Sequence, residues 1–173
     1  MFGAFFYVMK EIKLTRGYVA IVDDEDFEKL SKFKWKADVR KSGLVYAKRF
    51  VEKNIDGIRY RRSFYLHREI MEAIGRGNLI DHENGCPLDC RRDNLRPCDY
   101  AQNNRNSKVK SIRNEGIKGV YLRPSGRWSA QITFNYKNIC IGTFDTIELA
   151  ALAYDKMAIE LFGDFARTNF KQN

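Results

Sequence analysis

The chain has 173 residues, of which 44% are hydrophobic and 31% charged, so we expect folded segments rather than a disordered tail. Lys and Arg total 31 against 22 Asp and Glu, and the resulting net charge of +9 suits a polyanionic partner, although basic proteins without one also exist. No run of 18 apolar residues is present, so we expect no membrane span.

The N-terminal part predicts a hairpin followed by a short helix. Strands over 10–14 and 18–22 are separated by Arg16-Gly17, which is typical of a turn. Four acidic residues at 23–26 then open a helix, because carboxylates complement the positive end of a helix dipole. The apolar face expected for this helix consists of Phe27, Leu30 and Phe33.

Three further strands are expected over 35–39, 45–51 and 59–66, with a turn at Ser42-Gly43. Basic side chains occur along these strands, which fits either a sheet that faces phosphates or a solvated sheet face. These side chains are Lys48, Arg49, Arg59, Arg61 and Arg62.

The four cysteines do not form a zinc-binding pattern. Cys86, Cys90 and Cys98 are spaced C-x3-C-x7-C rather than as C-x2-C pairs, and no His follows at ligand distance. Reduced thiols in a cytoplasmic protein are the better interpretation, also for Cys140. Residues 1–8 are apolar but lack the basic start and cleavage site of a signal peptide, so we expect a cytoplasmic location.

A cluster of polar residues follows a short apolar strand that ends in Asp81-His82. Asn94 comes twelve positions after His82, within the stretch RRDNLR, and Asn103 comes nine positions later. Asn103 lies on a helix expected to start after Asp99. The expected local order is therefore strand, irregular loop, strand and helix.

The motifs DHENG, RRDNLR and QNNRN resemble the HNH nucleases with their ββα-metal fold, over roughly residues 60–106. The closest likeness is to homing endonucleases of phages and introns, which implies a bacterial or phage-infected cell. The resemblance implies that His82 is the general base, that Asp81 and Asn103 bind one divalent metal, and that Asn94 orients the loop and the scissile phosphate. Mg²⁺, or another divalent cation such as Mn²⁺, is the implied cofactor.

These residue types suit phosphodiester hydrolysis, because imidazole titrates near neutral pH and a hard cation neutralises the departing oxygen. Each residue alone fits a turn or a loop equally well, and only the joint spacing favours the nuclease. His67 either supports the metal site, touches phosphate or packs in the core. The residues expected to contact DNA phosphates near this motif are Arg91, Arg92 and Arg96.

The C-terminal part predicts three strands and one helix after a basic linker at 107–115. The strands fall within 119–144, and the helix over 147–162 has Thr146 or Asp145 as its N-cap and Gly163 at its end. The helix side chains assigned to the core are Leu149, Leu152 and Tyr154.

Residues 116–170 resemble the APETALA-type, or ethylene-response-factor, DNA-binding domain. The matching pieces are GRWSAQI at 126–132, IGTFDT at 141–146, AALAYD at 150–155 and the closing Asn169-Phe170. The resemblance implies a three-stranded sheet in the major groove with a helix behind it, and Trp128 packed on that helix. The implied DNA-facing residues are Lys118, Tyr121, Arg123, Gln131, Thr133 and Asn138.

The whole chain is thus interpreted as an α+β protein with an N-terminal β-rich region (1–58), a nuclease core (59–106), a linker (107–115) and a DNA-binding domain (116–173). The predicted function is a metal-dependent DNA endonuclease of the homing type, with double-stranded DNA as its partner and no membrane partner. The alternatives are a sequence-specific DNA-binding regulator with an inactive nuclease core and a structure-specific RNA-binding protein.

Overall fold

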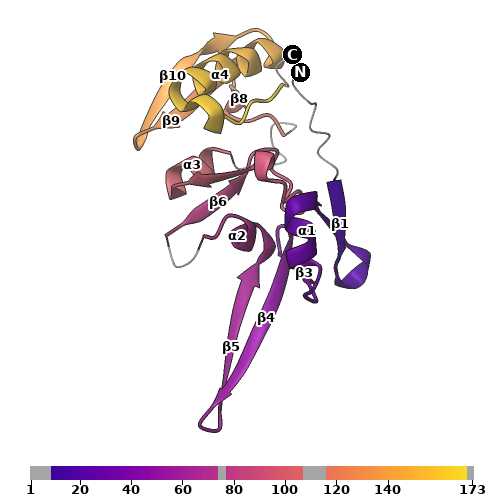
Figure 1. Ribbon diagram of the computed structural model, residues 1–173. Coiled ribbons are helices and arrows are strands. Elements are labelled where there is room, and N and C mark those ends of the chain that lie inside the picture. Colours follow the sequence, from indigo (N-terminus) through magenta and orange to yellow (C-terminus); the bar gives the residue numbers. More distant parts are fainter. Residues whose placement is uncertain (1–8, 74–76, 107–115, 171–173) are drawn as a thin grey trace. The chain divides into compact units, whose positions relative to one another are not determined.

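The computed structural model describes residues 9–73, 77–106 and 116–170, and the chain divides into two compact units, Met1–Asp99 and Tyr100–Asn173 (Figure 1). The predicted α+β class is confirmed, because small antiparallel sheets are combined with a few helices. None of the helices in these ranges is long and apolar enough to cross a membrane.

The first unit contains three small antiparallel sheets, which pair β1 with β2, β4 with both β3 and β5, and β6 with β7. Its strands are β1 (Met9–Lys13), β2 (Val19–Asp23), β3 (Lys36–Val39), β4 (Val45–Ile55), β5 (Ile58–Tyr65), β6 (Leu79–His82) and β7 (Leu95–Cys98). Its α-helices are α1 (Asp24–Leu30) and α2 (Leu66–Ile70), and short 3-10 turns lie at Thr15–Gly17 and Arg92–Asn94.

The core of the first unit joins the N-terminal hairpin to the polar loop that follows β6. Ile21 donates its backbone N–H to the carbonyl of Leu88 and accepts from the N–H of Cys90, both at 2.8 Å. Leu30 and Trp35 are buried beside this hairpin, and the indole Nε1 of Trp35 donates to the carbonyl of Leu30 at 2.9 Å. Phe33 was expected on the same face but is 41% exposed, because α1 ends at Leu30.

The hairpin of β4 and β5 is longer than the sequence pattern predicts and extends away from the rest of the first unit (Figure 1). Its turn is Asp56-Gly57, and both residues have positive φ angles of 51° and 77°. Such a two-residue turn matches the twist of the flanking strands, so pairing continues without a break from Ile55↔Ile58 to Lys48↔Tyr65. We call residues 45–65 the β4–β5 ribbon.

The second unit contains a three-stranded antiparallel sheet in the order β10-β9-β8, with α4 packed on one face. Its elements are α3 (Tyr100–Arg105), β8 (Val120–Leu122), β9 (Trp128–Phe134), β10 (Lys137–Phe144), α4 (Ile147–Phe162) and a 3-10 turn at Gly163–Phe165. The predicted bounds of the long helix are confirmed. Thr146 accepts a hydrogen bond from the N–H of Leu149 at 3.3 Å, and Gly163 ends the helix with a φ of 53°.

The core face of α4 differs from the prediction. Leu149 and Leu152 are 51% and 54% exposed, so assigning them to the core was wrong, whereas Tyr154 is buried as expected. The remaining core positions of the helix are the small residues Ala150, Ala151 and Ala158, which let its backbone approach the sheet closely. Trp128 packs against this core, as predicted.

Hydrogen bonds of Asp155 and Asn169 connect the C-terminal end of the second unit to α4 and to the segment before β8. The buried carboxylate of Asp155 accepts hydrogen bonds from the backbone N–H groups of Asn169 and Phe170 at 2.8 and 2.9 Å. The side chain of Asn169 accepts from the N–H of Lys118 at 2.6 Å and donates to the carbonyl of the same residue. The Asn169-Phe170 pair therefore closes the domain by joining α4 to the segment that leads into β8.

Candidate nucleic-acid interface

Asp81 and His82 lie at the end of β6, where they pair with Arg96 and Leu95 of β7. Both side chains are buried, and the ring of His82 lies 4.8 Å from that of His67, centre to centre. Burial, together with the charges of His82 and Arg68, lowers the pKa of His67 to about 3. Burial also lowers the pKa of His82 to about 4, although Asp81 and Asp89 act in the opposite direction.

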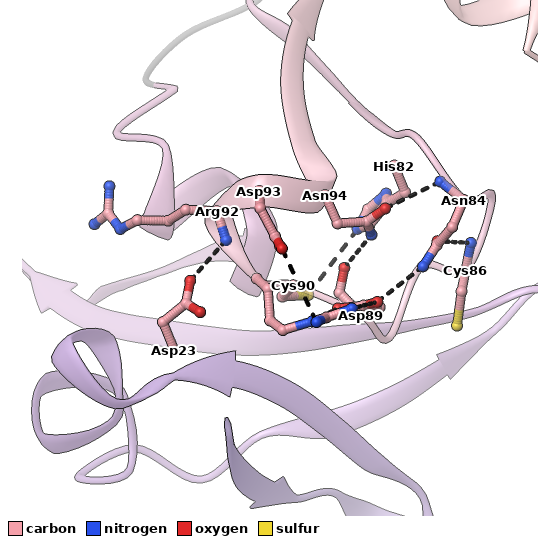
Figure 2. A network of polar contacts seen from close by, with 10 residues as sticks. Asp23, His82, Asn84, Cys86, Asp89, Cys90, Arg92, Asp93 and Asn94 are labelled. Carbon is pink, nitrogen blue, oxygen red and sulfur yellow. Dashed lines mark hydrogen bonds and ion pairs between the residues drawn. The ribbon is translucent and has the colours of Figure 1, made fainter. Parts of the chain in front are cut away.

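Asn94 holds together the loop between β6 and β7 (Figure 2). Its side-chain oxygen accepts from the N–H of Asn84 at 3.0 Å, and its amide nitrogen donates to the carbonyl of Asp89 at 2.7 Å. Asn84 in turn donates to the carboxylate of Asp89 at 2.8 Å and accepts from the N–H of Cys86. These bonds give Asn94 a structural role that does not require a substrate.

The three arginines expected to contact phosphate near this loop each pair with a buried or largely buried aspartate. Arg91 binds Asp89 through two bonds of 2.7 and 2.8 Å, and this contact holds the pKa of the Asp89 carboxyl below its usual range. Arg92 forms two bonds of 2.8 Å to Asp26 of α1, and its backbone N–H donates to Asp23 (Figure 2). The expectation that these guanidinium groups bind phosphate stays a prediction.

The predicted metal site does not gain support from the donor atoms. Oδ2 of Asp81 accepts two hydrogen bonds from Arg96, at 2.9 and 3.1 Å, so a cation already neutralises this carboxylate. Asp81 belongs to the first unit, whereas Asn103 is an exposed residue of α3 in the second. Within the described parts of the chain, no group of three or more His, Cys, Asp or Glu residues is arranged to hold a metal. The Mg²⁺ requirement stays a prediction, and the function proposed below does not depend on it.

The sheet of the second unit has one face against α4 and one open polar face. Ala130 and Ile132 are buried under the helix, so the alternate residues Gln131 and Thr133 point to the other side. Asn138 lies opposite Thr133 in the register and connects these side chains by two hydrogen bonds. Its amide nitrogen donates to Gln131 at 3.2 Å, and its oxygen accepts from the Thr133 hydroxyl at 3.3 Å.

Other side chains extend this polar face. Tyr121 is 50% exposed and pairs with Ser129 in the register, and Arg123 follows on the same side at the turn into β9. The exposed Cys140 was not predicted to lie on this face, although the β9–β10 register places it opposite Gln131. Arg127 was not predicted there either; it lies two residues before Ser129 and pairs with Asp145 at 2.9 Å. Alternation along β9 and β10 was the signal for both residues.

Lys118 differs from the other residues expected to face DNA. Its side chain is largely buried and donates a hydrogen bond to the carbonyl of Arg105 within the second unit. Burial, with the nearby charge of Arg167, lowers the pKa of Lys118 to about 8. A phosphate contact by this lysine stays a prediction, and its bonds to the α3 end and to Asn169 give it a structural role.

The segment that contains this sheet and most of α4 matches a protein family. Residues 115–164 match the family model of the AP2 domain. An AP2 domain therefore occupies residues 115–164. The resemblance of this segment to the APETALA-type domain, predicted from the sequence, is confirmed.

Several plant proteins are similar to the C-terminal part of the chain. An ethylene-responsive transcription factor of Arabidopsis thaliana is 48% identical over 59 residues, which cover 31% of this chain and 37% of the relative. One from Lotus japonicus is 46% identical over 73 residues, covering 41% of this chain and 25% of the relative. An AP2/ERF and B3 domain-containing protein of Oryza sativa subsp. japonica is 47% identical over 53 residues, covering 31% and 14%. The chain thus spans little more than a third, or less, of the length of these relatives.

These matches correct the prediction of an endonuclease. The family model that matches is that of the AP2 domain, and the ethylene-responsive relatives are named as transcription factors, which are not hydrolytic enzymes. The prediction of a hydrolase that cleaves DNA was therefore wrong. The structure gives the motif residues another explanation, because Asp81 pairs with Arg96, His82 packs against His67 and Asn94 fastens its loop.

Proposed function

We propose that the AP2 domain recognises a specific sequence in double-stranded DNA through the open face of its sheet, and that the chain acts as a DNA-binding regulator. The observation that carries this proposal is the row of mutually hydrogen-bonded polar side chains on the face opposite α4, in which Thr133 and Asn138 are exposed and Gln131 is half-buried. A sheet face that only contacts water does not require polar side chains that are hydrogen-bonded to one another. The names of the relatives, which are transcription factors, support the regulatory role.

The size of this face suits the major groove of DNA. Adjacent strands lie about 4.8 Å apart, so three strands span roughly 10 Å between the outer backbones. The major groove is about 12 Å wide and displays a different pattern of donors and acceptors for each base pair. Because α4 covers the opposite face, the sheet approaches DNA with the polar side only.

The side chains of this face are of the types that read bases. Gln131 and Asn138 carry amides, each of which can donate to and accept from the major-groove edge of adenine. Arg123 can bind guanine through two parallel hydrogen bonds, and the methyl group of Thr133 can contact that of thymine. Asn138 donates to Gln131 and accepts from Thr133, and these two hydrogen bonds hold the amides in position before DNA binds, which reduces the entropy lost on binding.

Gln131→Ala and Asn138→Ala are expected to reduce discrimination between the preferred duplex and a scrambled one by about 1–3 kcal/mol each, because each removes contacts to a base edge. Fluorescence anisotropy of the full chain on both duplexes measures this difference. Leu152→Ala, on the exposed side of α4, is the matched control and should leave discrimination unchanged. Equal discrimination by all four proteins would remove the sheet face from recognition.

A further inference from the structure

The net positive charge of the first unit is concentrated in the β4–β5 ribbon. Residues 45–65 contain six Lys and Arg side chains and two acidic ones, a net charge of +4. The rest of Met1–Asp99 is balanced, with 14 basic and 14 acidic residues. A polyanion approaching this unit is therefore attracted to the ribbon rather than to the unit as a whole.

The two faces of the ribbon differ in charge pairing. One face carries Glu52, which forms ion pairs with Arg59 and Arg61. The opposite face contains no acidic residue, as the register shows. Its members are Arg49, Val51, Lys53, Ile55, Ile58, Tyr60, Arg62 and Phe64.

The outer part of the acid-free face carries two cationic side chains that are not ion-paired within the described residues. Arg49, near the base, is held by Glu69 of α2 through bonds of 2.6 and 2.9 Å. Among the residues that the structure describes, Lys53 and Arg62 form no ion pair, and both are exposed. Next to them, large apolar side chains stand open to solvent: Ile55 is 51%, Ile58 59% and Tyr60 52% exposed.

We propose that this acid-free face of the β4–β5 ribbon is a second DNA-binding surface, separate from the AP2 domain. Lys53 and Arg62 bind the phosphates of a duplex, and the apolar end formed by Ile55, Ile58 and Tyr60 contacts the sugars that line a groove. A two-stranded ribbon fits the major groove, and apolar side chains beside basic ones are a known means of contact with the minor groove. The surface contributes affinity for any sequence, since phosphates carry no sequence information.

Charge favours DNA over a protein as the occupant of this face. Protein interfaces are depleted of lysine at their centre, whereas here Lys53 and Arg62 flank the apolar end and, among the described residues, neither forms an ion pair with a carboxylate. Both cations can therefore exchange water for phosphate oxygens without first breaking an ion pair. The binding of these cations to phosphates releases counterions from DNA.

The test uses the full chain and a labelled 30-base-pair duplex of random sequence, titrated at several salt concentrations. Lys53→Gln/Arg62→Gln is expected to bind roughly tenfold more weakly at low salt and to lower the slope of log affinity against log salt by about 1.8, or 0.9 for each phosphate contact. The control Lys32→Gln/Lys41→Gln removes the same charge from exposed positions of the same unit outside the ribbon. Equal effects of the two double variants would overturn the proposal.

A second pair of substitutions tests the apolar end. Ile55→Ser/Ile58→Ser should weaken binding to the random duplex and leave the sedimentation of the free chain unchanged. If instead it converts a dimer to a monomer with unchanged DNA affinity, the face is a protein interface and the proposal fails. Failure of the AP2 proposal is recognised separately, because sheet variants change the preference between sequences whereas ribbon variants act on all sequences alike.

Discussion

Gly119→Ala is expected to unfold the second unit, whereas Gly126→Ala should leave it folded. Both glycines have positive φ angles, 74° and 79°, so both substitutions introduce a similar backbone strain of about 1 kcal/mol. A Cβ atom at Gly119 would lie 2.1 Å from two ring carbons of Tyr154 and 2.7 Å from the carbonyl oxygen of Gln131. At Gly126, no heavy atom lies within 4 Å.

The overlap at Gly119 cannot be relieved easily, because Tyr154 is 4% exposed and packed under the sheet. We expect a loss of about 4 kcal/mol or more in the free energy of unfolding, close to the whole stability of a small domain. Hydrogen exchange of the amides of β9 and β10, followed by mass spectrometry, measures the effect within this unit. Similar protection from hydrogen exchange in the two variants would show that the close approach of Gly119 to Tyr154 is not required for folding of this unit.

Acid is expected to destabilise the first unit through His67 and His82. Both rings are buried and their pKa values are lowered to about 3 and 4, so the folded unit keeps them neutral. In the unfolded chain, both histidines bind protons below a pH of about 6.5, their usual pKa. The free energy of unfolding is therefore at its full value above that pH and falls as the pH decreases. By pH 5 the loss is about 2 kcal/mol for each histidine, or about 4 kcal/mol for the pair.

Denaturant unfolding between pH 7 and 5 measures this loss. Each unit contains one tryptophan, so Trp128→Phe leaves Trp35 as the fluorescent reporter of the first unit. His67→Phe removes one titrating ring at a site where its Nδ1 has no hydrogen-bond partner in the described structure, and should reduce the pH dependence by about half. The carboxylate of Asp89 stays ionised in this range, because its contact with Arg91 holds its pKa below the usual value. A pH dependence unaffected by His67→Phe would contradict the account.

Local signals in the sequence were sufficient for much of the second unit. The bounds of α4 follow from Thr146 and Gly163, because capping depends on residues next to the helix end. The exposed face of the sheet follows from alternation in β9. The core face of α4 did not follow, because an apolar pattern does not show that alanines rather than Leu149 and Leu152 lie against the sheet.

The polar motif of the first unit shows where inference from spacing ends. The positions of Asp81, His82 and Asn94 are compatible with an active site and equally with a loop fastened by its own hydrogen bonds. Only the structure shows that Asp81 is paired with Arg96 and that Asn94 spans the loop from Asn84 to Asp89. The partner of Arg92, Asp26, is 66 residues away in sequence and has no local signal.

The most direct test of the central claim, that the AP2 domain reads DNA sequence, is selection by the full chain from a library of random duplexes followed by sequencing. We expect that one short motif is enriched, and that the enrichment disappears in Gln131→Ala/Thr133→Ala/Asn138→Ala while weak binding to all sequences persists. Recovery of no common motif with the unmodified chain, or of the same motif with the triple variant, would contradict it.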